Sequence, residues 1–100
     1  MVTDKYMNFK EMKLMISGRV QGVGFRHFTR TTAGDLGIKG WVRNLDNGEV
    51  EALIQGPEEQ LKIMLEKLKN GPMPARVDRV NIVNETENPD KKEKTFRVVH

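Results

Sequence analysis

Residues 13–37 have the sequence KLMISGRVQGVGFRHFTRTTAGDLG, in which the spacing of the apolar residues changes once. The short apolar run at residues 13–17 predicts a buried strand. A glycine-rich segment, residues 18–24, separates this run from a helical pattern that stops at Gly37, a typical helix end. The stripe of that helix consists of Phe25, Phe28, Thr29, Thr32, Ala33 and Leu36. Residues 13–37 therefore predict a strand, a loop and a helix in succession.

The middle of the chain predicts a hairpin followed by a second helix. Residues 39–45 and 49–55 are strand-like, and the Asn47-Gly48 pair between them tolerates the positive φ angles of a tight turn. Pro57 is typical of a first helical turn, and Gly71 is typical of a helix end. The apolar stripe of this second helix consists of Leu61, Met64, Leu65 and Leu68.

Two more strands are predicted near the end of the chain, at residues 77–83 and 95–99, on either side of a charged turn at residues 88–94. Without the last strand, the order β-α-β-β-α-β is that of the split βαβ motif. The predicted fold class is therefore α+β: a ferredoxin-like βαββαβ sandwich with two helices packed on one face of an antiparallel sheet. Residues 11–100 form the predicted domain, and the polar residues 1–10 form a predicted flexible N-terminal extension.

The composition fits one compact domain and excludes several chemistries. The chain has 100 residues, of which 37% are hydrophobic and 31% charged. No apolar run approaches the roughly 18 residues of a membrane span, and residues 1–10 lack the apolar core of a signal peptide, so we expect a cytoplasmic protein. The absence of cysteine excludes disulfides, zinc ribbons and a cysteine nucleophile. A net charge of +3 is compatible with anionic small molecules or nucleic acid.

The glycine-rich segment has the features of an anion-binding loop at a helix N-terminus. Glycines let the backbone curl so that successive N–H groups converge on one anion, although a plain tight turn is the alternative. The charges favour the anion. The helix opens with Arg26 and His27, no acidic residue lies between Glu11 and Asp35, and no Ser, Thr, Asp or Asn directly precedes Phe25. Cations at a helix N-terminus are unfavourable by about 0.3–1 kcal/mol, so an external anion is expected there.

Two common nucleotide-binding motifs do not fit this segment. The P-loop requires Gly-Lys-Ser/Thr, but Gly22 is followed by Val23. The dinucleotide fingerprint requires a third glycine at the position that His27 occupies. We therefore expect the loop to bind a single phosphoryl group.

Three segments of the chain resemble signatures of the acylphosphatase family. They are GRVQGVGFR at residues 18–26, GIKGWVRN at residues 37–44 and GPMPARVD at residues 71–78, and the likeness extends from about Met12 to Val99. The third segment is looser than the family pattern at Met73-Pro74. The first two motifs are highly specific in combination.

The resemblance implies a hydrolase that cleaves the carboxyl–phosphate bond of acyl phosphates without a metal, a cofactor or a covalent phosphoenzyme. It implies that Arg26 binds the phosphoryl group and that Asn44 orients the attacking water. The cradle for the phosphate would be formed by backbone amides, those of Val20, Gln21, Gly22, Val23 and Gly24. On this reading Gln21 acts through its backbone, and His100 has no role.

The predicted topology supports this assignment independently. The strands on either side of the first helix run parallel, so both end at the same edge of the sheet. One strand separates them in the ferredoxin-like order, which gives about 10 Å between Gly18 and Asn44. Alternation along the strand places Gly40, Val42 and Asn44 on one face, and we expect this face to lie under the helices.

Other functional classes share parts of this pattern. The RNA-recognition motif has the same βαββαβ order, but this sequence lacks its alternating aromatic residues. A catalytically idle family member and the acylphosphatase-like domain of hydrogenase-maturation proteins are further alternatives. The expected partner is a small-molecule acyl phosphate, with inorganic phosphate or sulfate binding in the loop. No nucleic acid or membrane partner is expected, and the protein is expected to be a monomer.

Overall fold

The computed structural model describes residues 8–100, so most of the expected N-terminal extension lies outside the described residues. The first strand, β1 (Phe9–Arg19), begins earlier than the predicted boundary at residue 11. Phe9 pairs with Pro57, and Lys10 pairs with both Gly56 and Glu87. The expected boundary was therefore wrong for residues 9 and 10, because strands on both sides of β1 extend its ladder beyond the apolar run.

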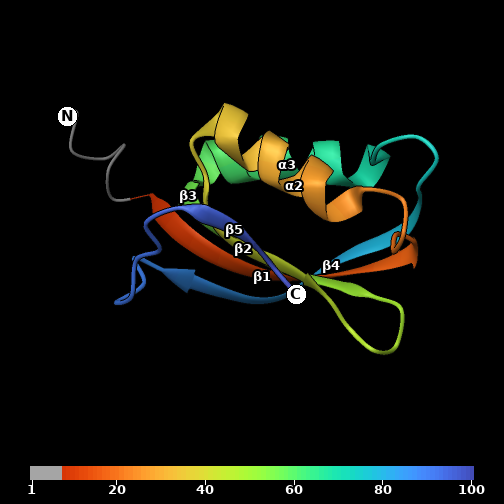
Figure 1. Ribbon diagram of the computed structural model, residues 1–100. Coiled ribbons are helices and arrows are strands. Elements are labelled where there is room, and N and C mark those ends of the chain that lie inside the picture. Colours follow the sequence, from red (N-terminus) through yellow and green to blue (C-terminus); the bar gives the residue numbers. More distant parts are fainter. Residues whose placement is uncertain (1–7) are drawn as a thin grey trace.

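Seven elements follow one another along the chain. They are β1, α2 (Phe25–Leu36), β2 (Lys39–Asn44), β3 (Val50–Pro57), α3 (Glu58–Asn70), β4 (Arg76–Glu87) and β5 (Phe96–Val99). Both helices lie on one face of a single sheet (Figure 1), as the sequence predicts. The predicted hairpin and both predicted helix ends are confirmed, with Gly37 in the left-handed conformation at the C-cap of α2.

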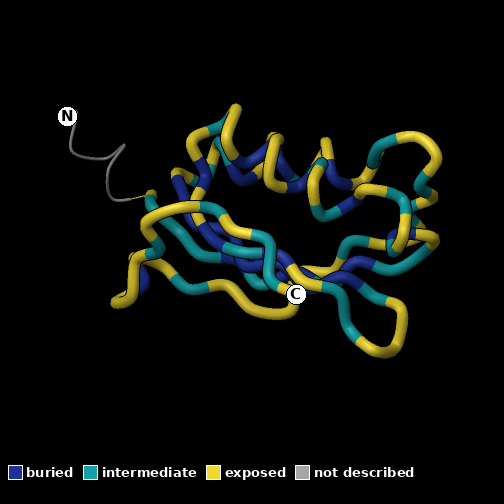
Figure 2. The backbone as a smooth tube through the Cα atoms, viewed as in Figure 1, coloured by how far each residue is buried: buried dark blue, intermediate teal, exposed yellow. Residues whose placement is uncertain are grey.

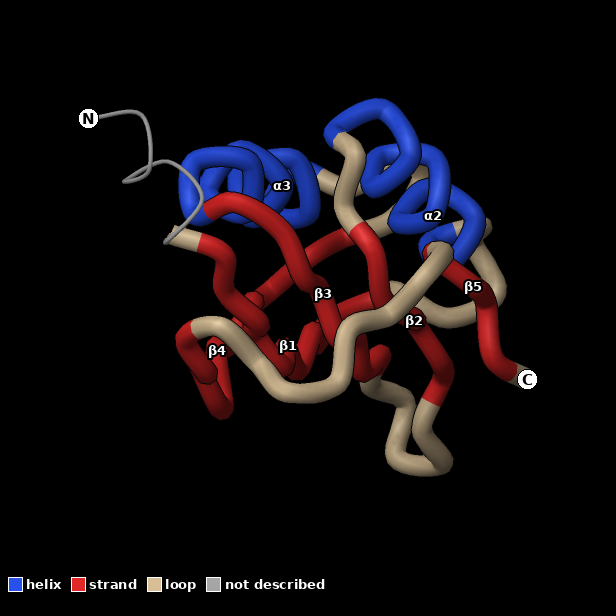
Figure 3. The backbone as a smooth tube through the Cα atoms, turned by 90° about the vertical axis from the view of Figure 1, so that its left-hand side faces the viewer, coloured by secondary structure: helices blue, strands red, loops and turns tan. Residues whose placement is uncertain are grey.

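The sheet has the strand order β4-β1-β3-β2-β5, and it is not wholly antiparallel. The first four strands pair antiparallel, but β5 pairs parallel to β2 and makes the sheet mixed. The expectation of an antiparallel sheet was wrong for this edge. The chain crosses from β4 at one edge to β5 at the other (Figure 3). Buried Gln55 secures the crossing segment, since its side chain donates to the Lys91 carbonyl at 2.9 Å and accepts from the Glu93 N–H at 2.7 Å.

The core lies between the helices and the sheet, where the tube in Figure 2 is dark blue. Alternate residues of β1 and β3 point into it, as do the stripes of both helices. The fully buried side chains include Leu14, Ile16, Ile54, Leu61, Met64 and Leu68. Truncating one such leucine to alanine costs about 2–5 kcal/mol, so this layer fixes the position of each helix on the sheet. No helix within residues 8–100 is long and apolar enough to span a membrane.

The fold brings the ends of β1 and β2 to the same edge of the sheet, with β3 between them. Gly40 and Val42 are buried beneath the helices, whereas Trp41 is half-buried and Arg43 is exposed on the other face. The predicted alternation in β2 is thus confirmed, and it places Asn44 on the helical side.

Candidate active site

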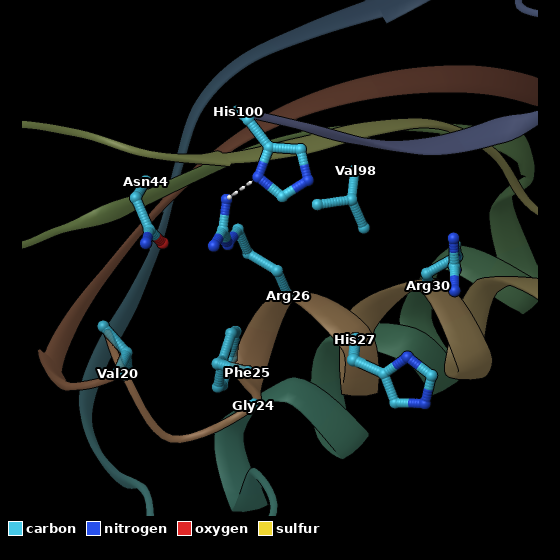
Figure 4. Close-up of a pocket in the computed structure, with 10 residues that line it drawn as sticks. Val20, Gly24, Phe25, Arg26, His27, Arg30, Asn44, Val98 and His100 are labelled. Carbon is cyan, nitrogen blue, oxygen red and sulfur yellow. Dashed lines mark hydrogen bonds between the residues drawn. The ribbon is translucent and has the colours of Figure 1, made fainter.

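A cavity of about 310 Å³ lies beside the N-terminus of α2, at the edge where β1 and β2 end. Its walls come from the loop of residues 20–24, from the first two turns of α2, from the end of β2 and from the end of the chain (Figure 4). The lining residues are Val20, Gly22, Gly24, Phe25, Arg26, His27, Arg30, Asn44, Val98 and His100. Most of the site residues predicted from the sequence therefore line this one cavity.

The loop of residues 20–24 has the backbone conformation of an anion-binding turn. Gly22 and Gly24 have φ angles of 75° and 79°, which residues with a Cβ rarely adopt. A Cβ at either position would meet nothing within 4 Å, so backbone conformation is the reason for glycine at both. No backbone N–H of residues 20–24 donates to a backbone acceptor within residues 8–100. The loop therefore offers a set of unpaired donors.

Helix α2 begins without the usual stabilising groups. Its N-cap is Gly24, no side chain caps it, and its first turn contains no acidic residue. The first turn contains Arg26 and His27 instead, and no Asp or Glu among the described residues lines the cavity. The positive end of the helix dipole and two basic side chains thus face the same space. This end of the cavity attracts anions.

Arg26 is held so that its guanidinium extends across the cavity toward Asn44 (Figure 4). Nη1 donates to the Val99 carbonyl at 3.3 Å and to Nδ1 of His100 at 3.2 Å. These contacts use one of the three guanidinium nitrogens, and the fork of the remaining N–H groups matches the geometry of a phosphate. His100, which is expected to have no role, therefore contacts the Arg26 guanidinium.

Asn44 is the last residue of β2, and its side chain points into the cavity. Its Oδ1 atom is buried and accepts no hydrogen bond within residues 8–100. A buried carbonyl oxygen without a donor is unfavourable by about 1–3 kcal/mol, so this atom is available to accept a hydrogen bond from a molecule in the cavity.

Gln21 fixes the loop through its side chain, which the sequence interpretation missed. Nε2 donates to the Leu45 carbonyl at 2.7 Å and to the Glu49 carbonyl at 2.8 Å. Both acceptors flank the turn between β2 and β3, and Leu45 directly follows Asn44. Gln21 therefore sets the position of the loop relative to the Asn44 amide. A polar residue in a glycine-rich segment gives no sign of such distant acceptors, so no sequence signal could have found it.

Within residues 8–100 no group of three or more His, Cys, Asp or Glu side chains is arranged to hold a metal ion. The polar groups of the cavity include backbone amides and the guanidinium groups of Arg26 and Arg30, which suit a phosphoryl oxygen.

Acylphosphatases share the sequence pattern and the fold of this chain. The family model described as Acylphosphatase matches residues 12–98. An acylphosphatase from Syntrophotalea carbinolica is 50% identical over 74 residues, which cover 74% of this chain and 80% of that protein.

Two solved structures extend the comparison to the fold. The crystal structure of an acylphosphatase from Bacillus subtilis has a TM-score of 0.86 and 35% identity, over 91% of this chain and 99% of that one. An acylphosphatase structure from Coxiella burnetii has a TM-score of 0.83 and 37% identity, over 97% of this chain and 99% of that one. Since the family model covers most of the sequence and these structures share its architecture throughout, the chain belongs to the acylphosphatase family.

Proposed function

We propose that this protein hydrolyses the carboxyl–phosphate bond of acyl phosphates in the cavity beside α2, releasing a carboxylate and inorganic phosphate. One observation carries the assignment. Unpaired main-chain donors at a helix N-terminus, the Arg26 guanidinium and a buried, unpaired oxygen of Asn44 all meet in a single cavity. Together these groups can hold a phosphoryl group and the water that attacks it.

The phosphoryl group binds in the loop of residues 20–24. Its oxygens accept from the backbone amides and from Arg26, which compensate the negative charge that a loose phosphoryl-transfer transition state spreads over these oxygens. Because His100 and the Val99 carbonyl already orient the guanidinium, little reorganisation is needed when the substrate arrives.

The attacking water is held by Asn44. Its Oδ1 accepts a hydrogen bond from the water, which leaves a lone pair on the water oxygen directed at phosphorus. As the new P–O bond forms, the bond from phosphorus to the acyl oxygen breaks, and its electron pair leaves with the carboxylate. A phosphoryl oxygen of the substrate accepts the proton that the water loses, because no Asp or Glu side chain within residues 8–100 lines the cavity to act as a base.

The leaving group explains why no strong general acid is needed. A carboxylate has a conjugate acid with a pKa of about 4, so it departs without protonation. An alkyl phosphate monoester would release a far more basic alkoxide. The site therefore favours mixed anhydrides over ordinary phosphate esters.

We further propose that the protein acts as a monomer. Inorganic phosphate, the product, and sulfate are expected to occupy the loop as competitive ligands. Neither phosphate nor sulfate requires a second macromolecule in order to bind there.

The assignment is tested by following the hydrolysis of benzoyl phosphate and of ethyl phosphate by the purified protein. We expect rapid turnover of benzoyl phosphate and none of ethyl phosphate above background. A benzoyl phosphate rate equal to that of the buffer alone would contradict the proposal.

A further inference from the structure

The cavity extends beyond the groups that the proposed reaction uses. Arg30 also lines it, four residues after Arg26 on the same helix. Residues four apart lie on one helix face, about 6 Å apart along the axis. In Figure 4 the Arg30 guanidinium lies beyond Val98, on the side away from Asn44. One basic group thus lies at each end of an apolar wall.

The charge of Arg30 is not neutralised by a neighbouring side chain. Within residues 8–100 no carboxylate forms an ion pair with it, whereas Arg43, Arg76 and Arg97 each have an acidic partner. No Asp or Glu lines the cavity either. A second anion in the cavity would therefore meet an uncompensated positive charge near Arg30.

The geometry of in-line displacement places the acyl group at the Arg30 end of the cavity. In-line displacement requires the leaving group to depart opposite the attacking water. Asn44 holds the water on one side of the phosphoryl group, so the acyl oxygen leaves on the other side, toward Val98 and Arg30.

We propose that Arg30 makes the protein selective for acyl phosphates whose acyl group carries a second negative charge. The inference rests on the proposed function, because it assumes that the phosphoryl group binds at Arg26. The preferred substrate has an anionic group at the end of its acyl part away from the phosphoryl group, with an apolar part between them that packs on Val98.

Two substrates of the same shape test this selectivity. Para-carboxybenzoyl phosphate carries the second charge, and para-carbamoylbenzoyl phosphate replaces the carboxylate by a neutral amide. The measured quantity is the ratio of their kcat/KM values, in the parental protein and in Arg30→Gln. Arg79→Gln serves as the matched control, because it removes the same charge from an exposed position on β4 that does not line the cavity.

We expect the ratio to fall about fivefold in Arg30→Gln, which is the size of a partly exposed ion pair, and to stay unchanged in Arg79→Gln. Arg30→Lys should restore most of the preference, and added salt should reduce it in the parental protein. The intrinsic reactivity of the two substrates cancels, since it is the same for every variant.

Two other results would contradict the inference, and they differ in what they imply for the proposed function. If Arg30→Gln leaves the ratio unchanged while both substrates are hydrolysed, the inference is wrong and the proposed function stands. If the parental protein hydrolyses neither substrate and does not hydrolyse benzoyl phosphate, the proposed function fails, and the inference fails with it.

Discussion

The two helices of this protein begin in opposite ways. Helix α3 has Glu58 and Glu59 in its first turn and Lys67 and Lys69 in its last turn, so its own side chains complement both ends of its dipole. Helix α2 has a left-handed glycine as its N-cap, no acidic residue in its first turn and no basic residue in its last turn. Both pack on the same sheet face, so their surroundings do not explain the difference (Figure 1).

We infer from this difference that the α3 N-terminus is structural and that the α2 N-terminus is functional. The α3 N-terminus is complete within the chain, since Glu58 also forms ion pairs with Lys10 at 3.4 Å and Lys62 at 3.7 Å. Neither helix has a side-chain cap, but the α2 N-terminus also lacks acidic residues and is left positive, which is unfavourable for the protein alone and favourable for an anion. Acidic residues usually occupy the first turn of a helix. Helix α3 follows this rule and α2 does not, from which we infer that the α2 N-terminus is the binding site.

The largest expected effect comes from removing the cation at the α2 N-terminus. Arg26→Gln should lower kcat/KM for benzoyl phosphate by roughly 10²–10³-fold and weaken phosphate binding, because the variant loses a charge that stabilises the transferring oxygens. Steady-state kinetics and a phosphate inhibition constant measure both effects. Arg79→Gln removes an equal charge from β4 and should have little effect. Equal losses in the two variants would show that net charge, rather than the contact, is responsible.

Asn44→Ala should reduce kcat by about a hundredfold with little change in KM, since the amide contacts the water and not the phosphoryl group. The comparison is with Asn81→Ala, an exposed asparagine of β4. Circular dichroism confirms that both variants are folded. Near-parental turnover of benzoyl phosphate by Asn44→Ala would refute the water-holding role.

Gln21→Leu should lower kcat/KM about tenfold, less than the roughly hundredfold effect of a 1 Å misplacement of catalytic groups. The variant keeps the size of the side chain but loses both hydrogen bonds that tie the loop to the β2–β3 turn. Gln60→Leu is the matched control, because it loses one hydrogen bond between the helices, to the Leu36 carbonyl. If both variants lose stability but neither loses activity, Gln21 only supports the fold.

The smallest effects come from exchanging the charge patterns of the two helices. His27→Glu places a carboxylate in the first turn of α2 and should stabilise the protein without phosphate by about 0.3–1 kcal/mol. It should also reduce the rise in Tm that phosphate produces, because a carboxylate next to the loop repels the ligand. Glu59→Gln should destabilise α3 by a similar amount and leave the phosphate-dependent rise unchanged. If phosphate raised the Tm of both variants equally, the two helix N-termini would not differ in phosphate binding.

Much of this comparison is predictable from sequence, because its signals are local. The period change at Phe25, the basic first turn of α2 and the acidic first turn of α3 each lie within a few residues. The side of the sheet on which Asn44 lies follows from alternation along a single strand. Such features depend on neighbours in the chain, and these are visible without a structure.

The remaining part of the site depends on contacts between distant segments. The four-residue strand β5 has no pattern that specifies its parallel pairing with β2, which carries His100 to Arg26 across more than seventy residues. The Gln21 side chain likewise bonds to carbonyls 24 and 28 residues away. Periodicity records which face a residue occupies, but not which distant backbone atom it meets.

A backbone amide NMR titration with inorganic phosphate tests most directly whether the α2 N-terminus binds a phosphoryl group. We expect saturable shifts to be largest at the amides of residues 21–25, to be small at the α3 N-terminus, and to be much weaker in Arg26→Gln. Shifts of equal size at both helices, or a titration that Arg26→Gln leaves unchanged, would contradict the account.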